Sequence, residues 1–149
     1  MQFSIIDENQ MENFGVALVN IIRPGHLVYV SGELGTGKTT LVRGVLKGLG
    51  HAVAVKSPTF TLVETYYFGR HQFFHFDLYR IQRPDELESI GIRDYLNAAD
   101  YCFVEWPERG AGILPSADFE INIEYVDSGR LVNINSVVDF DLSYLGAFI

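Results

Sequence analysis

A glycine-rich segment in the first third of the chain carries the residue types that hold a phosphate group. It reads GELGTGKT, which fits the pattern of a glycine, four residues, Gly-Lys and then a serine or threonine. Glycines let successive N–H groups turn toward one anion, the lysine adds a mobile charge, and the hydroxyl suits a magnesium ion between phosphates. The segment predicts a site for ATP and Mg²⁺ made by Gly32, Glu33, Leu34, Gly35, Thr36, Gly37, Lys38 and Thr39, with Thr40 at the α-phosphate.

Two acidic residues further along the chain each end a short apolar run. Asp77 follows FFHF at 73–76, and Glu105 follows YCFV at 101–104. A strand ending there delivers its carboxylate to the sheet edge where α/β folds bind ligands. Nucleotide hydrolysis needs an acid on the magnesium and a group that orients the attacking water. Either carboxylate suits either role, so the residues alone do not rank them. The alternative interpretation of each is an ordinary solvated acidic residue at the end of a strand.

Two further features lie near these acids in the sequence. Trp106, the single tryptophan, follows Glu105 and would lie close to a nucleotide if Glu105 holds the metal; a lone tryptophan also suits the core or a partner surface. Ser57-Pro58-Thr59 precedes an aromatic run, where Thr59 would sense the γ-phosphate as switch loops do. The other interpretation of this tripeptide is a plain turn with a capping hydroxyl.

The composition narrows the classes of function. The chain has 149 residues, 48% of them hydrophobic, and a formal charge of -8, which predicts one domain over 1–149 and disfavours tight binding of DNA or RNA. Because the sequence has neither a basic start nor a run of 18 apolar residues, we expect a cytoplasmic protein with no membrane segment. The one cysteine, Cys102, is interpreted as a buried small hydrophobe. The histidines lack metal-ligand spacing and are interpreted as structural: His26, His51, His71 and His75.

Helical and strand patterns place the glycine-rich segment between a strand and a helix. A capping pattern at Asp7 and Gln10 opens a helical repeat that reaches Ile22. The apolar run 27–30 predicts a buried strand, and a second helical repeat extends over 39–49. Strand, loop and helix in this order are the context that the phosphate motif requires.

The rest of the chain predicts mainly strands. Strands at 59–68 and 72–79 are expected to form one antiparallel hairpin, and strands at 119–125 and 131–137 a second. Between the hairpins, a short helix should begin at residue 84 and one more strand should cover 101–105. The expected architecture is α/β: a single-domain P-loop NTPase fold with a mixed parallel and antiparallel sheet flanked by helices.

Several segments together resemble one known family. Beside GELGTGKTT, the chain carries SPTFTLVE at 57–64, HFDLYR at 75–80, DELESIGIRDYL at 85–96 and VEWPERG at 104–110. In this order they resemble the TsaE (YjeE) family, the ATPases of bacterial tRNA threonylcarbamoyladenosine synthesis. Thr36 stands where the family usually has alanine or serine, and residues 118–149 carry little family signature.

The resemblance implies an ATPase that acts on a complex of two related proteins, TsaD and TsaB. TsaD transfers threonylcarbamoyl to adenosine 37 of tRNA, so tRNA would be met only indirectly, and neither DNA nor a membrane is implied. Carried over by motif, the phosphate and metal residues are Lys38, Thr39 and Glu105, with Asp77 supporting the metal water or the hydrolytic water. Trp106 would lie near the nucleotide, and its site would also be lined by Asp7, Glu8, Glu108 and Arg130.

Two other functions fit parts of the sequence. A small-molecule kinase would need an arginine-bearing lid, for which Arg80, Arg83 and Arg93 are available. A nucleotide-gated binding module would hold ATP without turnover. Because no segment resembles a pocket for a second substrate, ATP hydrolysis used to reset a partner complex is the leading hypothesis. Turnover without partners should be slow, because nothing in the sequence obviously supplies an arginine finger. Arg109 is the one candidate for that role.

Overall fold

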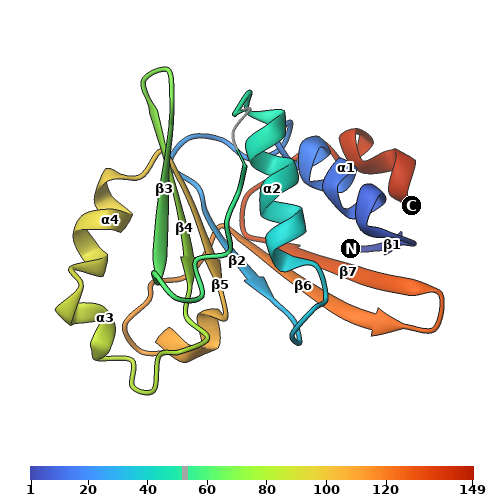
Figure 1. The fold of residues 1–149 in the computed structure, drawn as a ribbon. Coiled ribbons are helices and arrows are strands. Elements are labelled where there is room, and N and C mark those ends of the chain that lie inside the picture. The colour runs from blue at the N-terminus through green and yellow to red at the C-terminus, as the bar shows by residue number, and fades with distance from the viewer. Residues whose placement is uncertain (52–53) are drawn as a thin grey trace.

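One mixed sheet of seven strands runs through the molecule (Figure 1). The computed structural model describes residues 1–51 and 54–149, and its strands lie in the order β1-β7-β6-β2-β5-β4-β3. The strands are β1 Gln2–Ile5, β2 Leu27–Ser31, β3 Val63–Phe68, β4 His71–Asp77, β5 Tyr101–Glu105, β6 Phe119–Val126 and β7 Gly129–Ser136.

The middle of the sheet is parallel and both edges are antiparallel. Strands β6, β2, β5 and β4 are parallel neighbours, whereas β3 pairs antiparallel with β4, and β7 pairs antiparallel with β6 and β1. The predicted mixed sheet and both predicted hairpins are therefore confirmed. Because parallel strands point the same way, the carboxyl ends of β2, β4 and β5 meet at one edge of the sheet.

Helices cover both faces of the sheet (Figure 1). One buried cluster joins α1, α2 and η2 to the sheet, and a second joins α3 and α4 to the opposite face. Burial of each large apolar side chain in these clusters stabilises the fold by about 1.5–3 kcal/mol. The helices are α1 Glu8–Leu18, α2 Lys38–Gly48, α3 Glu86–Ser89, α4 Ile92–Ala98, and the 3-10 helices η1 Pro107–Gly110 and η2 Leu142–Phe148.

Helices α1 and α2 touch through their backbones. A Cβ atom on Gly15 would collide with the Leu41 carbonyl oxygen, and one on Gly44 would collide with the Glu12 carbonyl oxygen. Any larger side chain at either position would push the helices apart. This close approach brings the start of α1 beside the first turn of α2, where the phosphate loop ends.

The start of the first hairpin differs from the prediction. Residues 59–62 form a turn, and β3 begins only after it. Leu62 has a positive φ of 69°, and its N–H donates to the Pro58 carbonyl at 2.7 Å. Thr59 is held by its side chain, which donates to Asp77. A backbone bent in this way cannot continue a strand ladder. Residues 59–62 therefore form a loop, although their aromatic and β-branched side chains favour a strand.

Other element boundaries also differ. Helix α1 ends at Leu18 and not at Ile22, because residues 19–21 bond three residues back in a tighter turn. Strand β4 ends at Asp77, since the Tyr79 N–H donates to the Asp77 side chain. Strand β1, helix α4 and the 3-10 helices η1 and η2 were not predicted at all.

The C-terminal segment closes the core at one end of the sheet. Leu145 of η2 is fully buried, and the Phe148 ring meets the Phe14 ring of α1 edge-on at 5.0 Å. Tyr144 and Ile149 face outward, 51% and 78% exposed. The apolar residues on the buried side of this segment therefore close the core. No helix in the described part of the chain is long and apolar enough to cross a membrane.

Candidate functional site

The glycine-rich segment forms the loop between β2 and α2, and it borders a cavity of about 520 Å³. This volume lies in the range of small-molecule sites, roughly 300–1,000 Å³. Residues that the sequence singled out line most of it: Asp7, Glu8, Leu34, Gly35, Thr36, Gly37, Lys38, Thr39, Thr40, Thr59, Asp77, Glu105, Trp106 and Arg130. Ile6, Met11 and Ser57 complete the lining, whereas Gly32, Glu33 and Glu108 lie outside it.

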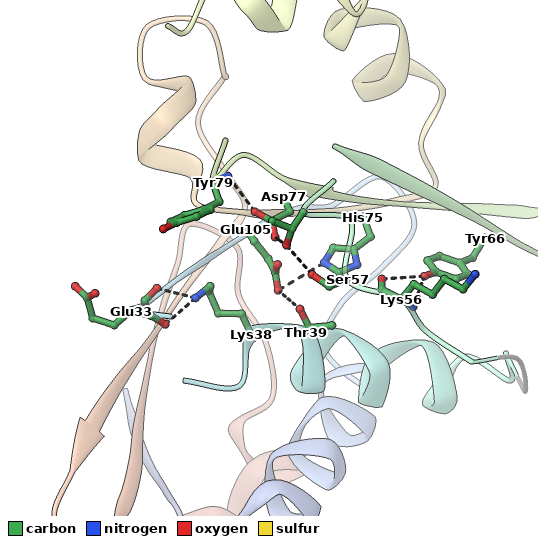
Figure 2. A network of polar contacts seen from close by, with 12 residues as sticks. Glu33, Lys38, Thr39, Lys56, Ser57, Tyr66, His75, Asp77, Tyr79 and Glu105 are labelled. Atoms are coloured by element: carbon green, nitrogen blue, oxygen red, sulfur yellow. Dashed lines mark hydrogen bonds and ion pairs between the residues drawn. The ribbon is translucent and has the colours of Figure 1, made fainter. Parts of the chain in front are cut away.

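Lys38 is buried, and its ammonium group points back into the loop (Figure 2). Its Nζ donates to the carbonyl oxygens of Gly32 at 2.7 Å and Glu33 at 2.8 Å. Burial lowers the pKa of Lys38, and the charges of Glu105 and Asp77 oppose that shift. Because carbonyl dipoles hold this charge and no carboxylate in the described part of the chain pairs with it directly, the ammonium group is available to an anion.

The two candidate carboxylates lie side by side at the end of β4 and β5. Asp77 and Glu105 are partners in the parallel register, and they are only 4% and 1% exposed. The Thr39 hydroxyl, in the first turn of α2, donates to Glu105 Oε1 at 3.0 Å (Figure 2). A hydroxyl and two carboxylates thus converge at the mouth of the loop, a donor set of the kind that Mg²⁺ accepts together with phosphate oxygens.

The surroundings of Glu105 favour its charged form. Burial by itself raises the pKa of Glu105, but His75, Thr39 and Lys38 together outweigh burial and hold that pKa below the ordinary 4.5. A carboxylate that stays ionised inside the protein is suited to a cation. Residue types alone did not rank the two acids, and this environment makes Glu105 the candidate metal ligand, the role that the family resemblance also implied.

Asp77 lies in the opposite situation. Burial raises its pKa, hydrogen bonds from the Tyr79 N–H and the Thr59 hydroxyl oppose the shift, and Glu105 adds to it. Thr59 Oγ1 donates to Asp77 Oδ2 at 2.7 Å, and Ser57 Oγ lies 2.8 Å from Thr59 Oγ1. The turn at 57–62 is therefore tied to the carboxylate whose pKa is raised, which suits Asp77 for holding a water molecule or moving a proton.

Trp106 lies at the wall of the cavity directly after β5. Its indole ring is 4.6 Å from Lys38 Nζ and 5.1 Å from the Tyr79 ring. The backbone there is left-handed, with φ of 56°, and the Trp106 N–H donates to the Val30 carbonyl. As the single tryptophan of the chain, it is a natural fluorescence probe of the cavity.

The tip of the β6–β7 hairpin supports the loop from the other side. The Tyr125 hydroxyl donates to the Leu34 carbonyl at 2.6 Å, and the Arg130 guanidinium lies 4.1 Å over the Tyr125 ring. Gly35 has φ of 77°, and a Cβ atom there would lie 2.8 Å from the Tyr125 hydroxyl oxygen. Tyr125 escaped sequence reasoning because nothing in its spacing connects it with residues 34–35.

The start of α1 forms the remaining wall. Asp7 caps the helix by accepting from the Gln10 N–H at 2.8 Å, as the capping pattern predicted. Glu8 Oε1 accepts from Arg43 at 3.3 Å and from the Thr40 hydroxyl at 3.5 Å. Both acids therefore line the cavity while bonded to the protein itself.

Two of the residues interpreted as structural have different outcomes. Cys102 is buried, and burial raises its pKa to about 12, which confirms it as a small hydrophobe without nucleophilic character. His75, by contrast, lies fully buried with Nε2 3.6 Å from Glu105 Oε1. The alternation of β4 places His75 and Asp77 on one face, and this period of two was the signal in the sequence.

These residues fit a magnesium nucleotide. Among the described residues, no group of three or more His, Cys, Asp or Glu forms a metal cage. Mg²⁺ needs none, because it commonly binds through one or two carboxylates and substrate phosphates. Residues available to hold it are Thr39, Glu105 and Asp77, next to loop amides and a buried lysine suited to the phosphates.

The strand, glycine-rich loop and helix at the carboxyl edge of a mixed sheet define a P-loop NTPase fold. The sequence profile of "Threonylcarbamoyl adenosine biosynthesis protein TsaE" matches residues 5–132. The chain belongs to the TsaE family, as the sequence motifs predicted.

Two curated relatives and one solved structure illustrate the similarity. The Haemophilus influenzae protein named tRNA threonylcarbamoyladenosine biosynthesis protein TsaE is 46% identical over 149 residues, which cover 97% of this chain and 94% of that protein. A Bacillus subtilis protein of the same name is 37% identical, with 77% and 72% covered. The crystal structure of Bacillus subtilis YdiB superimposes with a TM-score of 0.79 at 24% identity, covers 99% and 92% of the two chains, and supports the fold.

Proposed function

We propose that this protein is a Mg²⁺-dependent ATPase of tRNA N6-threonylcarbamoyladenosine synthesis. The observation that carries the proposal is the Thr39–Glu105 hydrogen bond, because it joins the end of a phosphate loop to a buried, ionised carboxylate. Membership of the TsaE family supports the pathway, since the relatives at 46% and 37% identity carry that pathway in their names.

Each residue of the site has a distinct task in this proposal. The loop amides and the Lys38 ammonium bind the phosphates, and the Thr39 hydroxyl and Glu105 carboxylate hold the metal ion. Mg²⁺, when bound, supplies neutralisation of charge on the β- and γ-phosphates. Asp77 orients the attacking water, since a carboxylate with a raised pKa can accept and return a proton. Trp106 closes one wall of the cavity.

We infer that the energy of hydrolysis is passed to a protein complex of the TsaD and TsaB kind. The residues that line this cavity come from the phosphate loop, the start of α1, the 57–59 segment, the two carboxylates, Trp106 and Arg130, all of them assigned to a nucleotide in this proposal. The turn at 57–62 bonds to Asp77 and lies on the surface, with Phe60 80% exposed. A change in the hydrogen bonding of Asp77 would therefore reach a surface that a partner can contact. With a chain charge of -8, tRNA is met through that complex.

A small-molecule kinase receives less support. The arginines that a lid would use are engaged elsewhere: Arg93 with Glu88 at 2.8 Å, Arg83 with Asp85 at 3.4 Å, and Arg80 over the Phe60 ring. Candidate metabolites mixed with ATP and the pure protein should yield no phosphorylated product.

The decisive experiment measures phosphate release from Mg·ATP, with and without a purified TsaD–TsaB pair. We expect slow release alone, stimulation by the pair, and loss of release in Glu105→Ala with nucleotide binding retained. Binding without release under every condition would leave a nucleotide-gated module and overturn the ATPase. Failure of the wild-type protein to bind Mg·ATP would overturn the site assignment itself.

A further inference from the structure

His75 lies beside Glu105, outside the lining of the cavity, and has no role in the function proposed above. Five buried residues in the described chain are polar or charged: Thr36, Lys38, His75, Asp77 and Glu105. Four of them belong to the phosphate loop or the carboxylate pair. His75 is the fifth, and its side chain is entirely shielded from solvent between α2 and the sheet (Figure 2).

The position of His75 is costly for the fold. Neither ring nitrogen makes a hydrogen bond within the described residues. A buried polar group without a partner costs about 1–3 kcal/mol. The neighbours of His75 on β4 are Phe73, Phe74 and Phe76, so a fourth apolar side chain at this position would avoid the free-energy cost of burying a polar one. A buried polar residue without a hydrogen bond breaks a general rule of protein structure, and such exceptions point to a functional constraint.

The contact that His75 makes is with one oxygen of Glu105. Its Nε2 lies 3.6 Å from Glu105 Oε1, the oxygen that also accepts from the Thr39 hydroxyl at 3.0 Å. The Thr39 hydrogen bond and the His75 contact both fall on Oε1 and not on Oε2. Both protein partners therefore gather on one oxygen of the carboxylate, and the other oxygen is left for a ligand.

We propose that His75 is a positioning residue for the metal ion. With the proton on Nε2, the imidazole attracts Oε1 of Glu105 electrostatically across 3.6 Å, so that Oε2 would face a bound Mg²⁺. Partners behind a metal ligand commonly act in this way, and their loss costs roughly 10–100-fold in metal affinity. The inference rests on the proposed function, because it takes Glu105 as the metal ligand. His75 touches neither nucleotide nor metal in this scheme.

The test compares Mg²⁺ binding at a fixed, saturating ADP concentration, followed through Trp106 fluorescence. His75→Gln keeps an N–H donor. His75→Met introduces a side chain of nearly the same length and flexibility as that of glutamine, but without a donor. We expect His75→Met to raise the half-saturating Mg²⁺ concentration about 10-fold or more, and His75→Gln to stay within about 3-fold of wild type. ADP affinity in EDTA should stay unchanged in both variants, because the amide cup and Lys38 are untouched.

A packing control separates positioning from simple disturbance of the core. Phe103 is the register partner of His75 on β5 and is fully buried, so Phe103→Leu loosens the same region without touching the Glu105 contact. Its half-saturating Mg²⁺ concentration should match wild type. His75→Phe provides a second variant without a donor if His75→Met fails to fold, as judged by a thermal melt.

The outcomes separate this inference from the proposed function. Equal Mg²⁺ requirements in wild type, His75→Gln and a folded variant without the donor would overturn the role of His75 alone. An equal rise in His75→Gln and His75→Met, or a rise in Phe103→Leu, would assign the effect to packing and also overturn it. If wild-type protein binds ADP with no dependence on Mg²⁺, the proposed function fails first.

Discussion

The two halves of the sheet contribute to the site in different ways. On one side, here called the strand-end side, the parallel strands β2, β4 and β5 end at the site. Asp77 ends β4, Glu105 ends β5, and the loop after β2 leads to Lys38 at the start of α2. On the hairpin side, β6, β7 and β1 contribute Tyr125 and Arg130, which hold carbonyl oxygens of the loop. One half supplies the reacting groups, and the other fixes the shape of the loop that surrounds the phosphates.

Buried charged residues are also distributed unevenly between the two halves of the sheet. The three charged residues that are buried in the described chain all belong to the strand-end side, whereas the core of the hairpin side is apolar. Buried charges lower the stability of the folded state unless they are paired. Substitutions on the strand-end side should therefore change turnover far more than stability, and substitutions on the hairpin side should do the reverse. Four substitutions test this division.

The largest effect is expected for Lys38→Ala. The ammonium group is the one cation that the loop itself supplies, and removal of a single charge-stabilising donor typically costs about 10²–10³ in kcat. Phosphate release should fall by about that factor, and nucleotide binding measured by calorimetry should weaken. The melting temperature should not fall, since a buried charge is removed. Full turnover in this variant would contradict the assignment of the strand-end side.

Leu145→Ala tests the hairpin side through its core. Leu145 of η2 is fully buried in the cluster with α1 and β1, so truncation should cost about 2–5 kcal/mol of unfolding free energy. Urea unfolding measures this loss, and Ile149→Ala, which is exposed, is the matched control. At temperatures where the variant is folded, phosphate release should equal that of wild type. A large fall in turnover of the folded variant would break the division.

Tyr125→Phe removes only the hydroxyl that bonds the Leu34 carbonyl. A hydrogen bond of this kind contributes about 0.5–1.5 kcal/mol, which corresponds to roughly 2–10-fold weaker nucleotide binding if it preorganises the loop. The turnover rate at saturating ATP should change little. Tyr67→Phe, on the exposed surface of β3, is the control. An unchanged affinity in Tyr125→Phe would mean that the loop keeps its shape without the hairpin.

The same division explains what the sequence could and could not predict. The phosphate loop and the acids at strand ends follow from residues close together in the chain, because a loop motif and an apolar run are local patterns. Strand β1 was missed because it has only four residues and its partner, β7, lies more than a hundred residues away. Tyr125 was missed for the same reason, since its bond to Leu34 spans 91 residues.

Elsewhere, local patterns predicted the wrong structure. The aromatic and β-branched residues at 59–62 have strand propensity, but the tertiary bond from Thr59 to Asp77 and the turn at Leu62 override it. His75 was interpreted as structural because no metal-ligand spacing surrounds it. Its contact with Glu105 depends on the pairing of β4 with β5, which the sequence alone does not specify.

A small change in stability, of unusual sign, is expected for Asp77→Asn. Burial raises the pKa of Asp77 above the ordinary 3.8, so between these two values the folded protein holds a proton that the unfolded chain has lost. Stability conferred by this group therefore falls as the pH rises through that window, and the penalty is complete at neutral pH. Asparagine keeps the size of the side chain and an oxygen for the Tyr79 N–H but carries no charge.

Without nucleotide, Asp77→Asn should therefore melt a few degrees above wild type at pH 7, and the two proteins should converge as the pH falls below 3.8. Asp139→Asn, on the exposed surface, should shift the melting temperature at neither pH. Phosphate release should fall in Asp77→Asn although the protein is more stable, because the group that orients water has lost its charge. A lower melting temperature at pH 7 would show that the bonds from Thr59 and Tyr79 outweigh the cost of burying the charge, and that this half of the site was not built at the expense of stability.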